Sequence, residues 1–185
     1  MAAKRRAAQP PRGERVRPSG VERAFYALAF RAETDPRARA VVVRMVNVFF
    51  RAMAFEKKRG GHRLFDFARA ASVRFGRWRA PVLKEKLGLD VTNMADMGRL
   101  QDWEDRVFAV TGHWTERGKT RATKCETVCP FANAAKGAPE ICTDVIHALE
   151  TATFRELNPT YRLVPLDRLL SKGDTQCDFK HEIED

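Results

Sequence analysis

Apolar residues recur at helical spacing in the first half of the chain. Positions 21, 24, 25, 28 and 29 are apolar, which predicts a helix over residues 21–31. The Asp35-Pro36 pair is typical of a helix start and Gly60-Gly61 of a helix end, so a second helix is expected between them, to about Lys58. Further helices are expected over residues 62–75, from Pro81 to Leu87, and over residues 93–105.

The pattern changes to alternation in the second half. Residues 106–116 and 119–125 are rich in β-forming side chains, and a turn at Arg117-Gly118 joins them. A helix is expected over residues 140–156, followed by strands over 161–170 and 176–183. A helical part (21–105) followed by a mostly antiparallel sheet with one crossing helix (106–185) predicts an α+β fold, in a single domain over 21–185.

Positive charge is concentrated at the start of the chain. The formal net charge is +10, and residues 1–20 hold six basic side chains against Glu14, together with three prolines. Such a segment buries too little apolar surface to offset its ordering entropy, so a disordered basic arm is expected. The arm could contact a protein partner or act as a solubilising tail. Motifs of nucleic-acid binding are missing, so nucleic acid is not an expected partner.

No apolar stretch is long enough to predict a membrane span. The longest apolar window, residues 41–55, is interrupted by Arg44, Asn47 and Arg51 and reads as an amphipathic buried helix. No apolar stretch of a secretory signal follows the first arginines. Four cysteines then indicate a reducing compartment, the cytoplasm, where clustered cysteines are more often metal ligands or reactive thiols than disulfides.

The cysteines are the residues most able to carry chemistry. Three or four thiolates could bind zinc, with His147, Asp144 or His181 replacing one of them. The same thiolates could hold an iron–sulfur cluster, or one of them could be a nucleophile. Small buried apolar side chains are the alternative for any single cysteine. The candidate metal ligands are Cys125, Cys129, Cys142 and Cys177.

Cys142 lies near an expected helix start, where the helix dipole favours thiolate. In an α-helix, residues five apart lie about 140° apart around the axis, so Cys142 and His147 would not face each other, and Asp144 has the same difficulty. A cluster assembled from separate segments is therefore preferred. His181 shares a strand face with Cys177, four residues earlier. Cys142, His181 and Asp144 are the candidate catalytic residues.

The C-terminal part resembles a known family. Cys125-x3-Cys129-Pro130, the helix carrying Cys142 and Asp144, and Gly173-Asp174-x-x-Cys177-Asp178-Phe179 resemble the L-2-amino-thiazoline-4-carboxylic acid hydrolase-like family over residues 90–183. The ending is also similar to 4-vinyl-reductase-type small-ligand-binding domains. The first resemblance implies a hydrolase acting on a cyclic amidine or amide-type substrate, at a C–N bond other than a peptide. The second implies a non-catalytic metal- or ligand-binding module; an iron–sulfur redox helper subunit is a third hypothesis.

Basic residues also interleave with aromatic ones over residues 63–79. This stretch would suit a small anionic substrate or ligand. The alternative is a helix with a solvated basic face and a buried aromatic one.

Overall fold

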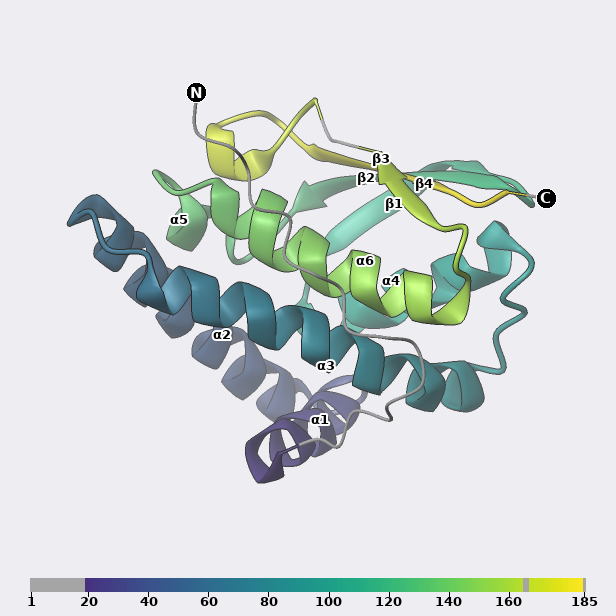
Figure 1. Ribbon diagram of the computed structural model, residues 1–185, viewed down its shortest axis with the longest axis horizontal. Coiled ribbons are helices and arrows are strands. Elements are labelled where there is room, and N and C mark those ends of the chain that lie inside the picture. Colours follow the sequence, from purple (N-terminus) through teal and green to yellow (C-terminus); the bar gives the residue numbers. More distant parts are fainter. Residues whose placement is uncertain (1–18, 165–166, 185) are drawn as a thin grey trace.

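The computed structural model describes residues 19–164 and 167–184. The predicted disordered arm over residues 1–20 therefore lies outside the described residues, apart from Ser19 and Gly20. Four helices come first along the chain (Figure 1). They are α1 (Gly20–Ala32), α2 (Pro36–Lys58), α3 (Arg63–Leu87) and α4 (Met94–Phe108).

A four-stranded antiparallel sheet follows in the order β1-β2-β4-β3. Its strands are β1 (Thr111–Arg117), β2 (Arg121–Val128), β3 (Arg162–Val164) and β4 (Cys177–Glu182). Between β2 and β3 the chain forms α5 (Ala132–Ala135), a π-helix (Ile141–Ile146) and α6 (His147–Leu157). The predicted α+β fold, with one crossing helix, is thus confirmed.

Side-chain caps start three of the first four helices. Ser19 and the side chain of Glu22 form a reciprocal capping box at α1. The carboxylate of Asp35 accepts from the Arg37 amide at 2.9 Å, with Pro36 in the first turn of α2. Asn93 accepts from the Ala95 amide at 3.0 Å at the start of α4. These short polar side chains satisfy amides that no helical carbonyl can reach.

Helix α3 runs without a break through Pro81, whereas the sequence predicts two separate helices. Proline removes one hydrogen bond from a helix interior and costs about 3 kcal/mol. Tertiary packing outweighs this cost, because Ala80 and Leu83 are fully buried on either side of the exposed Pro81. α3 also lies along α6 so closely that a Cβ on Gly76 would meet the carbonyl oxygen of Leu149 at 2.6 Å.

Helix α4 extends to Phe108, so the prediction that a strand begins at Arg106 is wrong. Leu100, Trp103 and Val107 follow helical spacing and are all buried in the main core, which favours the additional turn. The helix ends at Ala109, a non-glycine residue in the left-handed region with φ 55°.

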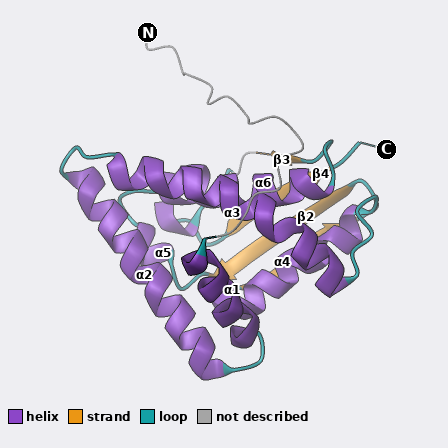
Figure 2. Ribbon diagram, turned by 60° about the horizontal axis from the view of Figure 1, so that its bottom comes forward, coloured by secondary structure: helices purple, strands orange, loops and turns teal. Residues whose placement is uncertain are grey.

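The elements stack in layers. Helix α6 packs against β3 of the sheet, and α3 lies on the other side of α6 (Figure 1). Helices α2 and α3 diverge from the Gly60-Gly61 turn as the two arms of a V (Figure 2). Of the helices that the structure describes, none is both long and apolar enough to cross a membrane.

Candidate functional site

Strand β2 separates Cys125 from the other cysteines. Cys125 pairs with Asp178 and Glu126 with Cys177 in the β2–β4 register, and successive strand residues point to opposite faces of a sheet. Cys125 therefore lies on the outer face of the sheet, beside Asp178 and Arg168. Burial and, to a smaller extent, the negative charge of Asp178 raise the pKa of its thiol. Cys125 lies within β2, and Cys129 directly follows the end of this strand.

The other three cysteines lie on the inner side of the sheet. Cys142 contacts the small apolar cluster that contains Cys177, and it also contacts, with Cys129, the cluster around α2 and α5. The amide of Leu170 donates to the sulfur of Cys177 at 3.2 Å. Glu126 faces these thiols from β2. We call Glu126, Cys129, Cys142 and Cys177 the thiol–carboxyl group.

Burial holds these thiols in their protonated form. It raises the pKa of Cys129 and of Cys177 to about 12. It also raises the pKa of Cys142, although the neighbouring Ser171 hydroxyl opposes that change. The expectation of a thiolate at Cys142 is therefore wrong for this state of the protein, because loss of water outweighs any effect of the helix terminus.

Cys142 lies in the π-helix, not in an α-helix as predicted. The amide of His147 donates to the carbonyl of Cys142, so residues five apart lie one turn apart. The geometric objection to a Cys142–His147 pair thus no longer holds. Their side chains nevertheless have different neighbours: the His147 ring packs edge-on against Phe179 at 5.9 Å, while Ser171 lies beside Cys142.

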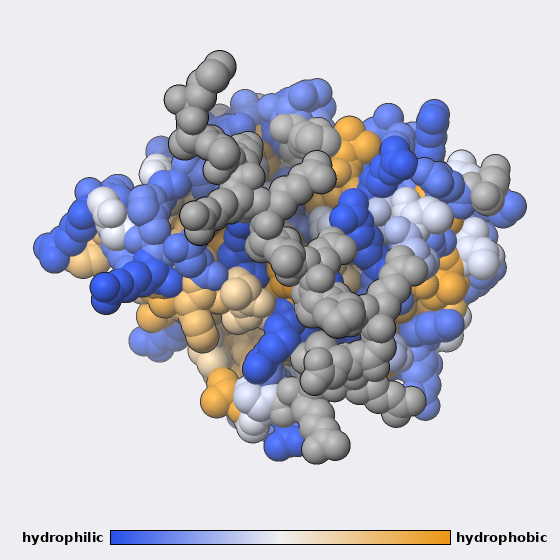
Figure 3. Space-filling view, viewed as in Figure 1, coloured by the Kyte–Doolittle hydropathy of each residue, from blue (hydrophilic) through white to orange (hydrophobic). Residues whose placement is uncertain are grey.

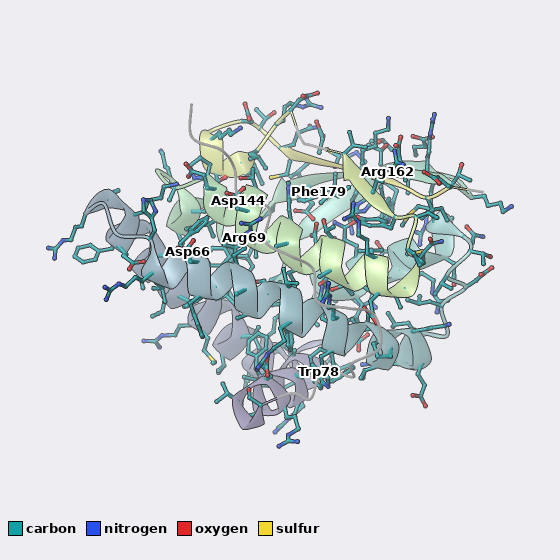
Figure 4. The ribbon with its side chains drawn as sticks, in the orientation of Figure 1. Asp66, Arg69, Trp78, Asp144, Arg162 and Phe179 are labelled. Atoms are coloured by element: carbon teal, nitrogen blue, oxygen red, sulfur yellow. The ribbon has the colours of Figure 1, made fainter. Side chains whose placement is uncertain are left out.

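His181 and Asp144 lie apart from this group. His181 shares the inner sheet face with Cys177, as predicted, but four residues of strand span about 13 Å and Phe179 lies between them. Its Nδ1 is 2.7 Å from the Tyr161 hydroxyl, and burial lowers its pKa to about 3. Asp144 is exposed in the segment leading into α6 (Figure 4). The predicted catalytic set is therefore not assembled.

The predicted four-cysteine metal site is not assembled either. Within residues 19–164 and 167–184, no three His, Cys, Asp or Glu side chains are arranged to hold a metal ion. Cys125 is excluded by the alternation of β2.

A polar layer lies between the sheet and the helices. Arg79 pairs with Glu104 at 2.5 Å, and Lys124 pairs with Asp105 at 2.7 Å. Glu126 forms no ion pair within the described part of the chain. Burial and, to a smaller extent, the negative charge of Asp105 raise the pKa of its carboxyl group to about 8. Burial likewise raises the pKa of Glu150 well above its usual value. At neutral pH Glu126 is therefore mostly protonated.

Several buried polar atoms near this layer have no hydrogen-bond partner among the described residues. They include Nη2 of Arg79, both amide atoms of Gln101 and Oε2 of Glu150. Buried polar groups in native proteins are nearly always satisfied, so each of these atoms calls for a water or another polar partner. The sequence offers no signal for this layer, because it is assembled from α3, α4, α6 and β2.

The outer face of α2 is apolar as well as its inner face. Val42, Phe50 and Met53 are buried in the core. A second set on the helix is exposed, and we call it the α2 stripe: Val41, Met45, Val48, Phe49 and Phe55, 37–62% exposed. Apolar surface is visible at the lower left of the molecule in Figure 3. The prediction of an amphipathic buried helix is therefore correct for the face that packs in the core and wrong for the exposed apolar stripe. A signal was present in the sequence, because apolar residues occupy more of the helix circumference than one core face needs.

A hollow borders this stripe. It has a volume of about 440 Å³ and is lined by Arg44, Asn47, Val48, Arg51, Pro130 and Asn133. Phe131, packed against Phe50 with ring centroids 5.7 Å apart, holds the Pro130 side of the hollow against α2. Within the described part of the chain, neither Arg44 nor Arg51 has an ion-pair partner.

Comparison with known proteins concerns the fold. No protein-family model and no curated protein matches the chain. Trafficking protein particle complex subunit 3 from Naegleria fowleri, solved covalently bound to palmitic acid, matches with a TM-score of 0.58 at 9% sequence identity. The match covers 79% of this chain and 97% of that one. At this identity the likeness is one of architecture: the chain has the fold of a trafficking-particle subunit.

Proposed function

We propose that this protein is a non-catalytic binding subunit that docks a partner protein on the α2 stripe. The observation that carries the proposal is the exposure of Val41, Met45, Val48 and Phe55 along one side of a single helix. Contiguous exposed apolar residues mark interaction sites on soluble proteins. A helix that is apolar on both sides is normally covered on both.

The charge of α2 favours an acidic partner. The helix carries six basic residues and a single acidic one, Glu56, whose carboxylate accepts from the Leu64 amide. A second copy of this chain would place Arg44 and Arg51 against like charges, which disfavours self-association through this face. The similar structure is a subunit of a particle complex, and this supports a role in assembly.

We do not propose an alkyl chain between the sheet and the helices of this protein. The interface between sheet and helices in this chain contains Lys124, Glu126 and Glu150, all buried. An alkyl chain placed among them would leave their polar atoms without partners.

The stripe is tested with a synthetic helical peptide that has leucines at i, i+3, i+4 and i+7 and flanking glutamates. Val48→Asp should weaken its binding, measured by fluorescence polarisation, by about tenfold or more, because a carboxylate would be buried against apolar side chains. Circular dichroism should be unchanged, since Val48 is 62% exposed.

The matched control is Phe67→Asp, which alters an exposed apolar residue on α3 outside the stripe (67% exposed). This variant should bind the peptide as the parent does, within about twofold. Equal losses in both variants, or no binding by the parent protein, would contradict docking on α2.

A second candidate function is a small-molecule site at the thiol–carboxyl group, in a hydrolase of cyclic amidines or a ligand-binding module. The observation that favours it is the π-helix at Cys142, beside a protonated Glu126 and polar atoms without partners. π-helical turns occur frequently at functional sites. Catalysis by Cys142 would require a bound ligand or metal to lower the pKa of the thiol.

This candidate predicts a bound small molecule or metal in protein purified without air. Native mass spectrometry and metal analysis should find it in the parent protein, and Cys142→Ser with Glu126→Gln should lose it. Zinc, iron with sulfide, and an organic molecule would distinguish the hydrolase, redox and ligand-binding versions. A parent protein with the mass of the bare chain would count against all three.

A further inference from the structure

We infer that the hollow at Arg44 and Arg51 is a carboxylate-binding site that receives an acidic side chain of the docked partner. This inference rests on the proposed function, because the hollow borders the α2 stripe and shares Val48 with it. It adds the chemistry of the partner: a helix whose apolar face covers the stripe and whose glutamate or aspartate enters the hollow.

The two arginines lie on the same side of α2. They are seven residues apart, or two turns and about 10 Å along the axis, with Val48 between them. The guanidinium groups are long enough to converge on one group between them, and each presents a planar fork of donors that matches a carboxylate.

Both charges are available for a ligand. Some exposed arginines elsewhere are engaged in ion pairs: Arg74 pairs with Glu22 at 2.6 Å, and Arg168 pairs with Asp178 at 2.6 Å. Arg44 and Arg51 have neither an ion pair nor a hydrogen bond in the part of the chain that the structure describes. No acidic side chain lines the hollow to compete with an incoming carboxylate.

The opposite rim adds shape and polarity. Asn133, in the short helix α5, presents an amide with no hydrogen-bond partner among the described residues. Asn47 is held in place by donating to its own helix, at the Val43 carbonyl, at 3.1 Å. A concave site lined by two amides, Val48 and Pro130 as well as the arginines fits one inserted side chain better than a flat anionic membrane surface, which a protruding basic face would contact.

The test uses two versions of the helical peptide, one with glutamate and one with glutamine at the positions beside the leucine face. Arg44→Gln with Arg51→Gln should weaken binding of the glutamate peptide by about tenfold. It should change binding of the glutamine peptide by less than about twofold, since that peptide brings no charge to the hollow.

A charge-matched control is Arg37→Gln with Lys58→Gln, which removes the same charge from the two ends of α2. It should weaken binding of the glutamate peptide by less than about threefold, because only the long-range electrostatic attraction of the helix is reduced. If the Arg44/Arg51 variant lost affinity for both peptides to the same extent, the carboxylate site would be overturned, while docking on the stripe would still stand.

Failure of the parent protein to bind either peptide would overturn the proposed function and this inference together. A parallel arm uses vesicles of phosphatidylserine and phosphatidylcholine. If the Arg44/Arg51 variant lost vesicle binding and kept full affinity for the glutamate peptide, the hollow would be a membrane contact and the inference would be wrong.

Discussion

At the scale of single residues, burial decides the chemistry of the interior. Glu126 and Cys125 are neighbours in the chain, yet one faces the helices and the other the outer side of the sheet. Burial keeps Glu126 uncharged and raises its pKa to about 8. The same effect lowers the pKa of His181 to about 3, so this imidazole is neutral. These two shifts have opposite consequences for stability against pH.

We predict that stability falls as pH rises from about 6.5 to 8. The pKa of Glu126 is higher in the folded state than in the unfolded state. Its contribution to stability is therefore fully present below the unfolded pKa of 4.5 and is lost as pH rises to about 8. The contribution of His181 to the stability of the protein increases as pH rises from about 3 to the unfolded pKa of 6.5, and it is constant above that pH. The two slopes therefore cancel between 4.5 and 6.5.

Above pH 6.5 the Glu126 slope remains, about 1.4 kcal/mol per pH unit, or about 2 kcal/mol up to pH 8. Glu150 acts in the same direction. Urea unfolding at a series of pH values measures the slope. Glu126→Gln should flatten it, whereas Glu85→Gln, at an exposed glutamate of α3, should not. A parent protein whose stability is constant from pH 6.5 to 8 would contradict a buried, protonated Glu126.

At the scale of elements, packing decides where helices end. α3 passes through Pro81 because the helix is fixed along its length against α6. The π-helix similarly places Cys142 one turn from His147, which no α-helical reading of the sequence provides.

Pro81→Ala tests the continuity of α3. Proline is about 3 kcal/mol less favourable than alanine inside a helix, and its stiffening of the unfolded chain offsets about 0.4–1 kcal/mol of that difference. The substitution should therefore raise the free energy of unfolding by about 2 kcal/mol, measured by chemical denaturation. If a helix began at Pro81, as the sequence suggests, the same change would leave stability equal or lower.

At the scale of the whole molecule, the sheet and the helical part are joined by polar contacts as well as by the core. Trp114 of β1 donates to Asp102 of α4 at 2.7 Å, and Lys124 of β2 pairs with Asp105 at 2.7 Å. These contacts agree with one domain over residues 21–185, which stays a prediction, as does a contact of the basic arm with a partner. Among the described residues, the α2 stripe with its hollow is an apolar surface that no other element covers.

The sequence by itself determined the α+β order of elements, the start of α2 at Asp35-Pro36, and the shared face of Cys177 and His181. These features follow from local rules of spacing, capping and alternation, which act within a few residues. Only the tertiary structure decided the rest. It separated Cys125 from the other thiols and extended α3 through Pro81. Among the described residues, it also left Glu126, Arg44 and Arg51 without an ion-pair partner. Each of these outcomes depends on which distant segment packs alongside, and that information is absent from any local window.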